Sequence, residues 1–509
     1  MLFNSTLFLF AFLPLALGAF LAMKRRAGPG VLIGWLLAAS LLFYAWAQPT
    51  FLALLLGSVA VNFGLGIAIQ DASDERRRRV WLALGVVTNL AALGVFKYAH
   101  FALGSWNQLT GADLALPPIG IPLAISFFTF QQIAYLSDTA AGQVRERRLG
   151  HYALFVAFFP KLVAGPIVHH GEMMEQLDAL PARRETSRDL AVGLTLFGMG
   201  LFKKVVLADG IAGRAAGFFD LAAEGVSLTF LEAWTGAFGF TMQVYFDFSG
   251  YSDMALGLAR CFGIILPLNF HSPYKATDIN EFWRRWHVTL TRWLRLFLFV
   301  PISRSFMRRG ERWEAPGIAI AQLVTMGLCG LWHGAGWSFL AWGLLHGVLL
   351  VLHEAWRTLK SKLGLAGRLP PRVGQPLARL ATLATLIVSF VVFRAADLSI
   401  AFEMLNAMAE LGEAFDARAH ARFLTLVGLD GALALTGLLA IVWLAPNSQE
   451  ILADYEPALD LRRFSRSKIP AALRWRPSAA WASLSVAALL TSIYFILVEG
   501  YEEFIYRFF

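Results

Sequence analysis

The sequence is poor in charged residues and has almost no cysteine. Only 16% of its 509 residues are charged, whereas 57% are hydrophobic, and the mean hydropathy is +0.58. Soluble domains carry about 25% charged residues, so this composition excludes a soluble protein and predicts a polytopic membrane protein. The two cysteines, Cys261 and Cys329, lie in apolar stretches, which argues against a disulfide framework and a cysteine-based metal site.

The motifs of several enzyme classes are also missing. The chain has no glycine-rich phosphate loop, no Gly-x-Ser-x-Gly elbow, and no group of His, Cys, Asp and Glu at metal-ligand spacing. Its formal charge of +9 is a feature of many nucleic-acid-binding proteins, but the basic residues occupy short loops between apolar runs. The positive-inside rule explains them better, so we expect neither a nucleic-acid partner nor a metal.

Long apolar runs predict an all-α membrane protein. A helix needs roughly 20 residues to cross a bilayer, and runs of that order occupy about 2–23, 31–47, 51–70, 80–103, 117–138, 190–208, 228–247, 315–331, 336–353, 378–394, 424–445 and 480–499. The runs 151–168 and 252–270 are interrupted by Pro or Gly and predict half-spans or re-entrant segments. Because there is no flexible linker and no internal repeat, we expect a single domain over residues 1–509.

The placement of charge predicts how these spans are oriented. The first basic cluster, 24–26, follows the first apolar run, so we expect an uncleaved span with the amino terminus outside; cleavage after about residue 19 is the alternative. The loops that then lie inside are all basic: 24–30, 71–79, 143–150, 357–379 and 446–479. The outer loop 395–422 is rich in Asp and Glu, and the same count places the tail 499–509 outside.

His333 is the first candidate for chemistry. It lies in the sequence Gly-Leu-Trp-His-Gly-Ala-Gly-Trp at 330–337, inside the nearly uncharged stretch 315–352. An imidazole there is costly to desolvate, so it is either well satisfied by partners or present for chemistry. The glycines beside it predict a break in the helix, and non-helical backbone at membrane depth is tolerated where it is buried in protein or lines a cavity.

A second polar block, 243–253, stands at the end of an apolar run and carries the side chains of Asp247, Ser249, Tyr251 and Asp253. Gly250 predicts a helix break there, and Asp247 and Tyr251 would share a face at i,i+4 spacing. A hydrogen-bonded structural cluster is the more frequent explanation of such a block, and a direct catalytic role is the alternative.

Basic residues form three further candidate groups. The segment 280–312 interleaves aromatic residues with arginines and predicts a helix at the cytoplasmic interface, which contacts anionic lipid, forms a platform for an anionic cytosolic substrate, or does both. His287 would share a face of that helix with Trp283 and Thr291, which is more typical of packing than of catalysis. Lys161 precedes a Gly-Pro break and suits an anion or a carbonyl, or else snorkels to the interface, whereas Lys203 and Lys204 fit a helix end.

These blocks together resemble the signature motifs of the membrane-bound O-acyltransferase (MBOAT) family, most closely its bacterial alginate O-acetyltransferase (AlgI-like) branch. The resemblance rests on 246–255 (Phe-Asp-Phe-Ser-Gly-Tyr-Ser-Asp-Met-Ala), 281–287 (Glu-Phe-Trp-Arg-Arg-Trp-His) and 330–334 (Gly-Leu-Trp-His-Gly), with smaller blocks at 96–98, 159–166, 202–204 and 392–395. The core motifs occupy about 90–395, followed by spans and an aromatic tail over 424–509. The chain departs from related sequences at 296–305, which weakens an assignment to alginate itself.

The resemblance implies a ring of tilted helices with re-entrant segments around a central tunnel. It also implies roles for single residues: His333 and His287 as the catalytic pair, a tunnel lining and contacts to the acyl-CoA donor. The tunnel lining would comprise Asp247, Ser249, Tyr251, Asp253, Trp286 and Trp332. The donor contacts would be Arg284, Arg285, Lys161 and Lys204. No cofactor is implied, because acetyl-CoA would be a co-substrate.

The last six residues, 504–509 (Phe-Ile-Tyr-Arg-Phe-Phe), resemble the aromatic carboxyl-terminal motif of related exporters of acyl groups. In the D-alanylation system a similar peptide belongs to a separate small protein, whose tyrosine is proposed to carry the acyl group. Tyr506 is therefore a candidate acyl acceptor, and an interfacial anchor is the alternative.

The implied function is transfer of acetyl from cytosolic acetyl-CoA across the bacterial inner membrane, with both termini periplasmic. The implied partners are a periplasmic esterase-like (SGNH) acetyltransferase, a polysaccharide synthase or export complex and membrane lipids, and the product would be an acetylated alginate- or cellulose-like exopolysaccharide. The rival is a transporter or export channel, for which we would expect inverted repeats that the sequence does not show. A scaffold of a synthase complex is a third hypothesis, and it would not need His333.

Overall fold

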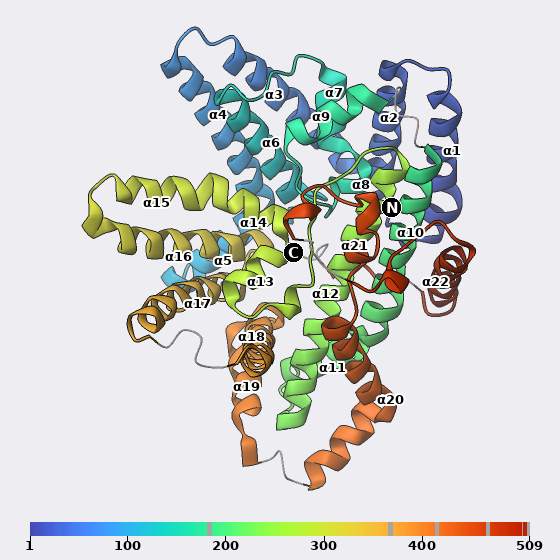
Figure 1. The fold of residues 1–509 in the computed structure, drawn as a ribbon. Coiled ribbons are helices and arrows are strands. Elements are labelled where there is room, and N and C mark those ends of the chain that lie inside the picture. Colours follow the sequence, from blue (N-terminus) through green and yellow to red (C-terminus); the bar gives the residue numbers. More distant parts are fainter. Residues whose placement is uncertain (181–185, 365–369, 413–416, 465–468, 501, 506–509) are drawn as a thin grey trace. The chain divides into compact units, whose positions relative to one another are not determined.

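A computed structural model describes residues 1–180, 186–364, 370–412, 417–464, 469–500 and 502–505 (Figure 1). Helices are the main secondary structure of the described residues, and the only β feature among those residues is an isolated bridge between Pro267 and Leu459. The prediction of an all-α protein is confirmed.

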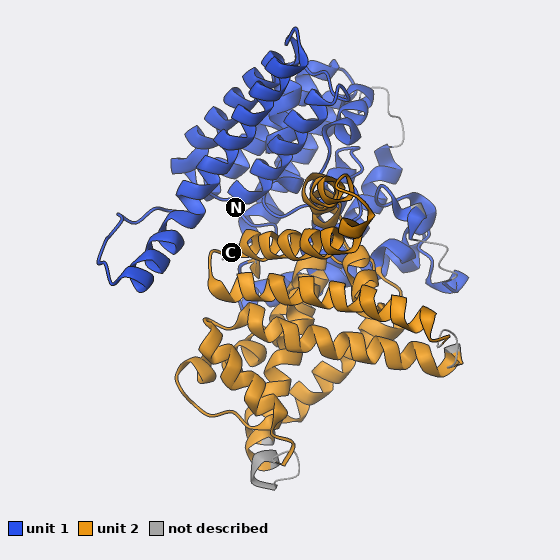
Figure 2. Ribbon diagram, turned by 90° about the vertical axis from the view of Figure 1, so that its left-hand side faces the viewer, with its two compact units in different colours: residues 1–201, 251–268, 448–503 blue, residues 202–250, 269–447, 504–509 orange. Residues whose placement is uncertain are grey.

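The chain forms two compact units, coloured separately in Figure 2. Unit 1 comprises 1–201, 251–268 and 448–503, and unit 2 comprises 202–250, 269–447 and 504–509. The helices of unit 1 are α1 (Leu13–Lys24), α2 (Pro29–Ala47), α3 (Leu52–Gln70), α4 (Glu75–Leu93), α5 (Ala99–Thr110), α6 (Ile125–Ala140), α7 (Leu149–Ala157), α8 (Phe159–Leu162), α9 (His170–Ala179), most of α10 (Thr186–Phe202), α21 (Ser448–Ile451) and α22 (Ala479–Val498).

Unit 2 holds most of the candidate site. Its helices are α11 (Asp209–Ala223), α13 (Ile279–Arg285), α14 (Val288–Leu294), α15 (Val300–Met307), α16 (Glu314–His333), α17 (Trp337–Lys362), α18 (Pro371–Arg394), α19 (Leu398–Ala409) and α20 (Ala417–Leu444). Two π-helical turns, Lys203–Ala208 and Arg295–Phe299, belong to it as well. The helix α12 (Phe230–Cys261) contributes its first part to unit 2 and its last part to unit 1.

Nine helical stretches among the described residues are long and apolar enough to cross a membrane, so the protein is a multi-pass membrane protein. Most of the predicted runs coincide with them. The run predicted at 117–138 is an exception, because residues 111–122 form no helix and α6 begins only at Ile125. Two consecutive prolines, Pro117 and Pro118, lack the N–H groups that a helix through this segment would need.

The predicted helix break at Gly250 is wrong. α12 runs without interruption for 32 residues, so the runs 228–247 and 252–270 do not form a span followed by a half-span. A glycine inside a helix costs about 1 kcal/mol relative to alanine, and burial of this helix on both sides of Gly250 outweighs that cost. Farther along α12, Gly257 approaches Gly193 of α10 so closely that a methyl group on either would collide with the other helix's backbone.

The helices α16 and α17 form a hairpin that positions His333. Their packing relies on Gly330 and Gly343, because a Cβ on either residue would meet the backbone of the opposite helix. α16 ends at His333 since Gly334 continues in an extended conformation, and α17 begins at Trp337. A Cβ at Gly334 would also collide with the ring of Phe339. The predicted break in the helix beside His333 is confirmed.

Candidate active site

His333 lies in a pocket of aromatic rings at the end of α16. Only 1% of its surface is exposed. The imidazole centroid is 4.9 Å from the ring of Trp332, 5.3 Å from Trp342 and 5.4 Å from Phe393, and each of these rings stands nearly perpendicular to it. Close aromatic packing on three sides holds the imidazole in place.

His287 occupies a break between two helices rather than a helical face. α13 ends at Arg285 and α14 begins at Val288, and between them His287 has left-handed backbone with φ of 41°. The prediction that it shares a helical face with Trp283 and Thr291 is therefore wrong. Left-handed backbone costs a non-glycine residue about 1–3 kcal/mol, and it persists where the surrounding structure determines it.

Asn269 fixes the orientation of the His287 ring. Its Oδ1 atom lies 3.0 Å from His287 Nδ1 and also accepts a hydrogen bond of 2.9 Å from the hydroxyl of Thr289. We therefore assign the proton to Nδ1, which leaves a lone pair on Nε2. Among the described residues no hydrogen-bond partner reaches His287 Nε2, although the atom is buried. Burial also lowers the pKa of His287, which lies outside the candidate spans, to about 3.

The two histidines meet at one tryptophan. The ring of Trp332 is 5.9 Å from His287 and 4.9 Å from His333. On its other side His287 packs edge-on against Phe248 of α12 at 4.8 Å. We call His287, Trp332 and His333 the histidine cluster. The structure thus brings together in unit 2 two residues that lie 46 positions apart in the sequence.

A third histidine extends this cluster, and its role was not apparent from the sequence. The indole N–H of Trp283 donates to His346 Nδ1 at 3.2 Å, and His346 Nε2 lies 3.2 Å from the hydroxyl of Ser389. The ring of Trp342 lies between His346 at 4.7 Å and His333 at 5.3 Å. No group of three His, Cys, Asp or Glu in the described part of the chain is arranged to hold a metal ion.

Two predicted tunnel residues, Ser249 and Trp286, are buried in unit 2. Trp286 packs at 5.1 Å against Phe270 and at 5.5 Å against Phe282. The Ser249 hydroxyl is buried and has no hydrogen-bond partner within the described ranges. Trp286 is therefore packed among aromatic rings, whereas Ser249 places a polar hydroxyl in the interior of unit 2.

Lys204 and Asp247 form a buried ion pair. Lys204 Nζ lies 2.6 Å from Asp247 Oδ1 and 2.6 Å from Asp209 Oδ1, and both Lys204 and Asp247 are almost fully buried. The other oxygen of Asp247 accepts a hydrogen bond of 3.1 Å from the backbone N–H of Ile505. Tyr506 itself lies outside the described residues. The predicted donor-binding Lys204 is thus engaged by two carboxylates.

Two predicted tunnel residues, Tyr251 and Asp253, belong to unit 1. Tyr251 is buried and stacks on Phe3 with ring centroids 4.9 Å apart. Asp253 accepts hydrogen bonds from the hydroxyl of Ser448 and from the side-chain amide of Gln449. Both residues therefore have partners that are provided by unit 1 itself.

Lys161 also lies in unit 1, and it is fully buried rather than at an interface. Its ammonium donates a hydrogen bond of 2.8 Å to Gln131 Oε1 and lies 4.7 Å from the centroid of the Phe155 ring. The Gly-Pro break that was predicted after it is present, because α8 ends at Leu162 and the next helix, α9, begins only at His170. Snorkelling to the membrane surface does not describe this lysine.

The adjacent arginines of α13 differ in their surroundings. Arg285 is half-buried, with Nη2 at 2.6 Å from Glu281 Oε1 and Nη1 at 3.2 Å from the carbonyl of His271. Burial alone would raise the pKa of Glu281, but hydrogen bonds from Thr277 and Arg285 outweigh it and lower that pKa. Arg284 is exposed. Of the two predicted donor contacts, Arg284 is the one that solvent reaches.

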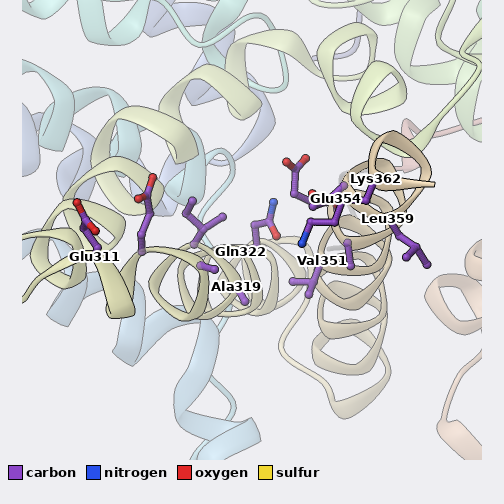
Figure 3. Close-up of a pocket in the computed structure, with 12 residues that line it drawn as sticks. Glu311, Ala319, Gln322, Val351, Glu354, Leu359 and Lys362 are labelled. Atoms are coloured by element: carbon purple, nitrogen blue, oxygen red, sulfur yellow. The ribbon is translucent and has the colours of Figure 1, made fainter. Parts of the chain in front are cut away.

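A pocket of about 630 Å³ lies elsewhere on the α16–α17 hairpin (Figure 3). It is lined by Glu311, Glu314, Ala315, Ile318, Ala319, Gln322, Val351, Glu354, Ala355, Thr358, Leu359 and Lys362. The lining residue closest to His333 along α16 is Gln322, which precedes it by about three helical turns, or about 16 Å. None of the predicted site residues lines this pocket, so it is not the candidate active site.

Comparison with known proteins shows related membrane enzymes. Residues 139–369 match the membrane-bound O-acyltransferase (MBOAT) family. A peptidoglycan O-acetyltransferase of Helicobacter pylori is 41% identical over 437 residues, which cover 81% of this chain and 80% of that protein. A probable alginate O-acetylase AlgI of Pseudomonas aeruginosa is 38% identical over 418 residues, covering 81% and 75%. A teichoic acid D-alanyltransferase of Streptococcus thermophilus is 30% identical over 290 residues, covering 53% and 68%.

Proposed function

Since the chain belongs to the membrane-bound O-acyltransferase family and is an O-acyltransferase, we propose that it transfers acetyl from cytosolic acetyl-CoA across a bacterial inner membrane for O-acetylation of a polysaccharide. The related proteins named above act on peptidoglycan, alginate and teichoic acid. Each of these names gives a polymer to which an acyl group is transferred. Peptidoglycan therefore joins alginate and cellulose-like exopolysaccharides as a candidate final acceptor.

The observation that carries the proposal is the histidine cluster. Two imidazoles contact one buried tryptophan in a site from which water is largely excluded. His333 is the general base: it accepts the proton of an attacking hydroxyl, whose oxygen bonds to the acetyl carbonyl carbon. The thioester C–S bond then breaks, and coenzyme A leaves as a thiol with the proton from the imidazolium. Because the single proton of the hydroxyl goes to His333, the lone pair on His287 Nε2 would accept a hydrogen bond from another donor group of the bound substrate and orient that substrate.

The donor enters from the cytoplasmic side in this proposal. Arg284 is exposed on α13, the helix that ends two residues before His287. Its guanidinium suits the phosphates of coenzyme A, because arginine binds phosphate oxygens in a bidentate manner. The thioester would then reach the histidine cluster while the nucleotide stays at the surface.

The acceptor is the hydroxyl of Tyr506 or of a serine on a periplasmic esterase-like (SGNH) partner. The contact between Asp247 and the Ile505 backbone supports Tyr506, because it brings the chain that carries this tyrosine to residues bordering His287. An ester on Tyr506 would leave the acetyl group on a periplasmic tail. The partner, within a polysaccharide synthase or export complex, would then place it on the polymer.

The test is incubation of the purified protein with radiolabelled acetyl-CoA. We expect release of free coenzyme A and label retained on the chain, which peptide mapping should assign to Tyr506. His333→Ala should reduce coenzyme A release by about 10²–10⁴-fold, the usual contribution of a general base. His353→Ala is the matched control, since His353 is partly exposed near Asp278 and lies outside the histidine cluster. Wild-type release by His333→Ala, or transport without release of coenzyme A, would refute the proposal.

A further inference from the structure

We propose that Lys204, Asp247 and Phe248 form a docking site for the carboxyl-terminal tail of the same chain, and that this site positions the tail beside the histidine cluster. The inference rests on the proposed function, in which the tail carries the acyl acceptor. It adds the residues that bind the tail, none of which needs to contact acetyl-CoA. All of them, together with the described tail residues Phe504 and Ile505, belong to unit 2.

Asp247 makes the first contact with the tail. Each of its two carboxylate oxygens binds a different partner. Oδ1 receives the ammonium of Lys204 at 2.6 Å, and Oδ2 accepts the backbone N–H of Ile505 at 3.1 Å. Lys204 thereby holds the carboxylate in the orientation that presents Oδ2 to the tail. A hydrogen bond to a charged acceptor is about twice as strong as a neutral one. A backbone donor makes this contact independent of the side chain at position 505.

The carboxylate of Asp247 contacts an ammonium that a second carboxylate also contacts. Lys204 Nζ lies 2.6 Å from Asp209 Oδ1 and 2.6 Å from Asp247 Oδ1. A buried carboxylate needs hydrogen bonds as well as a counter-ion. Lys204 and Asp209 are brought together by the π-helical turn Lys203–Ala208, a distortion that occurs frequently at functional sites.

Phe504 makes the second contact. Its side chain is 3% exposed, and its ring centroid lies 5.5 Å from the ring of Phe248. Phe248 in turn packs edge-on against His287 at 4.8 Å. The tail is therefore held at two points, one polar and one aromatic, and a single ring separates its buried end from a histidine of the cluster. The side chains of Lys204 and Asp247 are positioning residues in this arrangement.

The sharpest test removes one hydrogen-bond donor at the tail. Ile505→Pro eliminates the backbone N–H that Asp247 accepts, whereas the matched control Ile505→Ala shortens the side chain and keeps the N–H. Both changes lie near the end of the chain, where they should not prevent folding. Loss of a hydrogen bond to a charged group corresponds to about a tenfold or larger change in the equilibrium between the docked and the free tail.

Two measurements report on docking and on function separately. Carboxypeptidase digestion followed by intact mass measures access to the tail: Ile505→Pro should be trimmed about tenfold faster than the wild type, and Ile505→Ala at the wild-type rate. Steady-state release of coenzyme A should show about a tenfold lower kcat for Ile505→Pro with an unchanged KM for acetyl-CoA, because the donor end of the site is intact. Asp247→Asn should resemble Ile505→Pro in both measurements.

Each outcome decides the proposal. Wild-type trimming and wild-type kcat for Ile505→Pro would overturn the docking site. Faster trimming with a wild-type kcat would show a structural anchor and would overturn the positioning role. His333→Ala separates the two proposals, because it should leave trimming at the wild-type rate while abolishing transfer. If His333→Ala transfers acetyl normally, the proposed function fails while the docking site is still judged by trimming.

Discussion

Asp247 and Asp253 lie on the same helix, α12, yet their carboxylates have different partners. Asp253, in unit 1, accepts hydrogen bonds from the side chains of Ser448 and Gln449. Asp247, in unit 2, contacts Lys204 and the backbone of the tail at Ile505. Both are 1% exposed, so both carry a similar cost of desolvation. Asp253 is held by two internal side chains, whereas Asp247 is held by the side chain of Lys204 and by the backbone of the tail.

A similar contrast holds between two charged groups of unit 1 and one imidazole of unit 2. In unit 1, Arg260 lies 2.8 Å from Asp189 and Lys161 donates to Gln131, so these charged groups have partners from their own unit. In unit 2, His287 Nε2 is buried without a hydrogen-bond partner among the described residues. Buried polar groups are normally satisfied, and an exception in a native structure requires an explanation. We infer that the paired charges of Arg260 and Lys161 stabilise the protein and that His287 Nε2, which lies in the histidine cluster, binds substrate.

The largest effect on stability should follow from breaking a satisfied pair in unit 1. Arg260→Met would leave Asp189 buried without its guanidinium, and loss of one partner of a buried ion pair costs about 3–5 kcal/mol. We expect a lower apparent Tm and an unchanged turnover per folded molecule. Thermal unfolding of the purified protein and coenzyme A release by the folded fraction measure the two effects.

The control for Arg260→Met is Arg214→Met, which removes an exposed ion pair with Asp430 in unit 2. Exposed pairs contribute about 0–1 kcal/mol, so its apparent Tm should stay near the wild-type value. If Arg260→Met instead left the Tm unchanged and abolished turnover, the contrast between a structural unit 1 and a catalytic unit 2 would be wrong.

A smaller effect, on activity, is expected at Asn269. Asn269→Ala removes the acceptor that holds His287 Nδ1–H, and loss of one buried hydrogen bond is worth about 1–3 kcal/mol, or roughly 5–150-fold in kcat. Thr289→Val is a matched control. It removes a hydrogen bond to the same Asn269 oxygen but leaves the contact between Asn269 and the His287 ring in place. Equal loss of kcat in the two variants would show that Asn269 supports the backbone rather than the orientation of His287.

The sequence allowed the helical class and the motif residues to be predicted, because apolar runs and charge placement act locally. It placed His333 correctly at the end of a helix, since glycines follow it directly. It did not predict Asn269 as the partner of His287, nor His346 as part of the site. Asn269 lies 18 positions from His287, and Trp283, which donates to His346, lies 63 positions from it, so both contacts form only through tertiary packing.

The continuation of α12 through Gly250 was also not predicted from the sequence. Helix propensity disfavours glycine, but burial of the surrounding residues outweighs a penalty of about 1 kcal/mol. In the same way, the alternation of aromatic residues and arginines predicted one helix through His287, whereas tertiary contacts with 269–271 stabilise the break there. Local patterns therefore predicted the elements better than their ends.

The smallest expected effect concerns two adjacent arginines, one exposed and one paired. Arg284→Gln should raise the KM for acetyl-CoA about two- to fivefold, the range of an exposed ionic contact, and the difference should shrink as salt is added. Arg285→Gln should leave this KM unchanged and lower the apparent Tm, because Glu281 loses its partner at 2.6 Å. Measuring KM at two ionic strengths distinguishes the variants. If Arg285→Gln raises the KM for acetyl-CoA more than Arg284→Gln does, the donor contacts the arginine that is paired with Glu281. Exposure of a side chain would then not identify the residues that bind the donor.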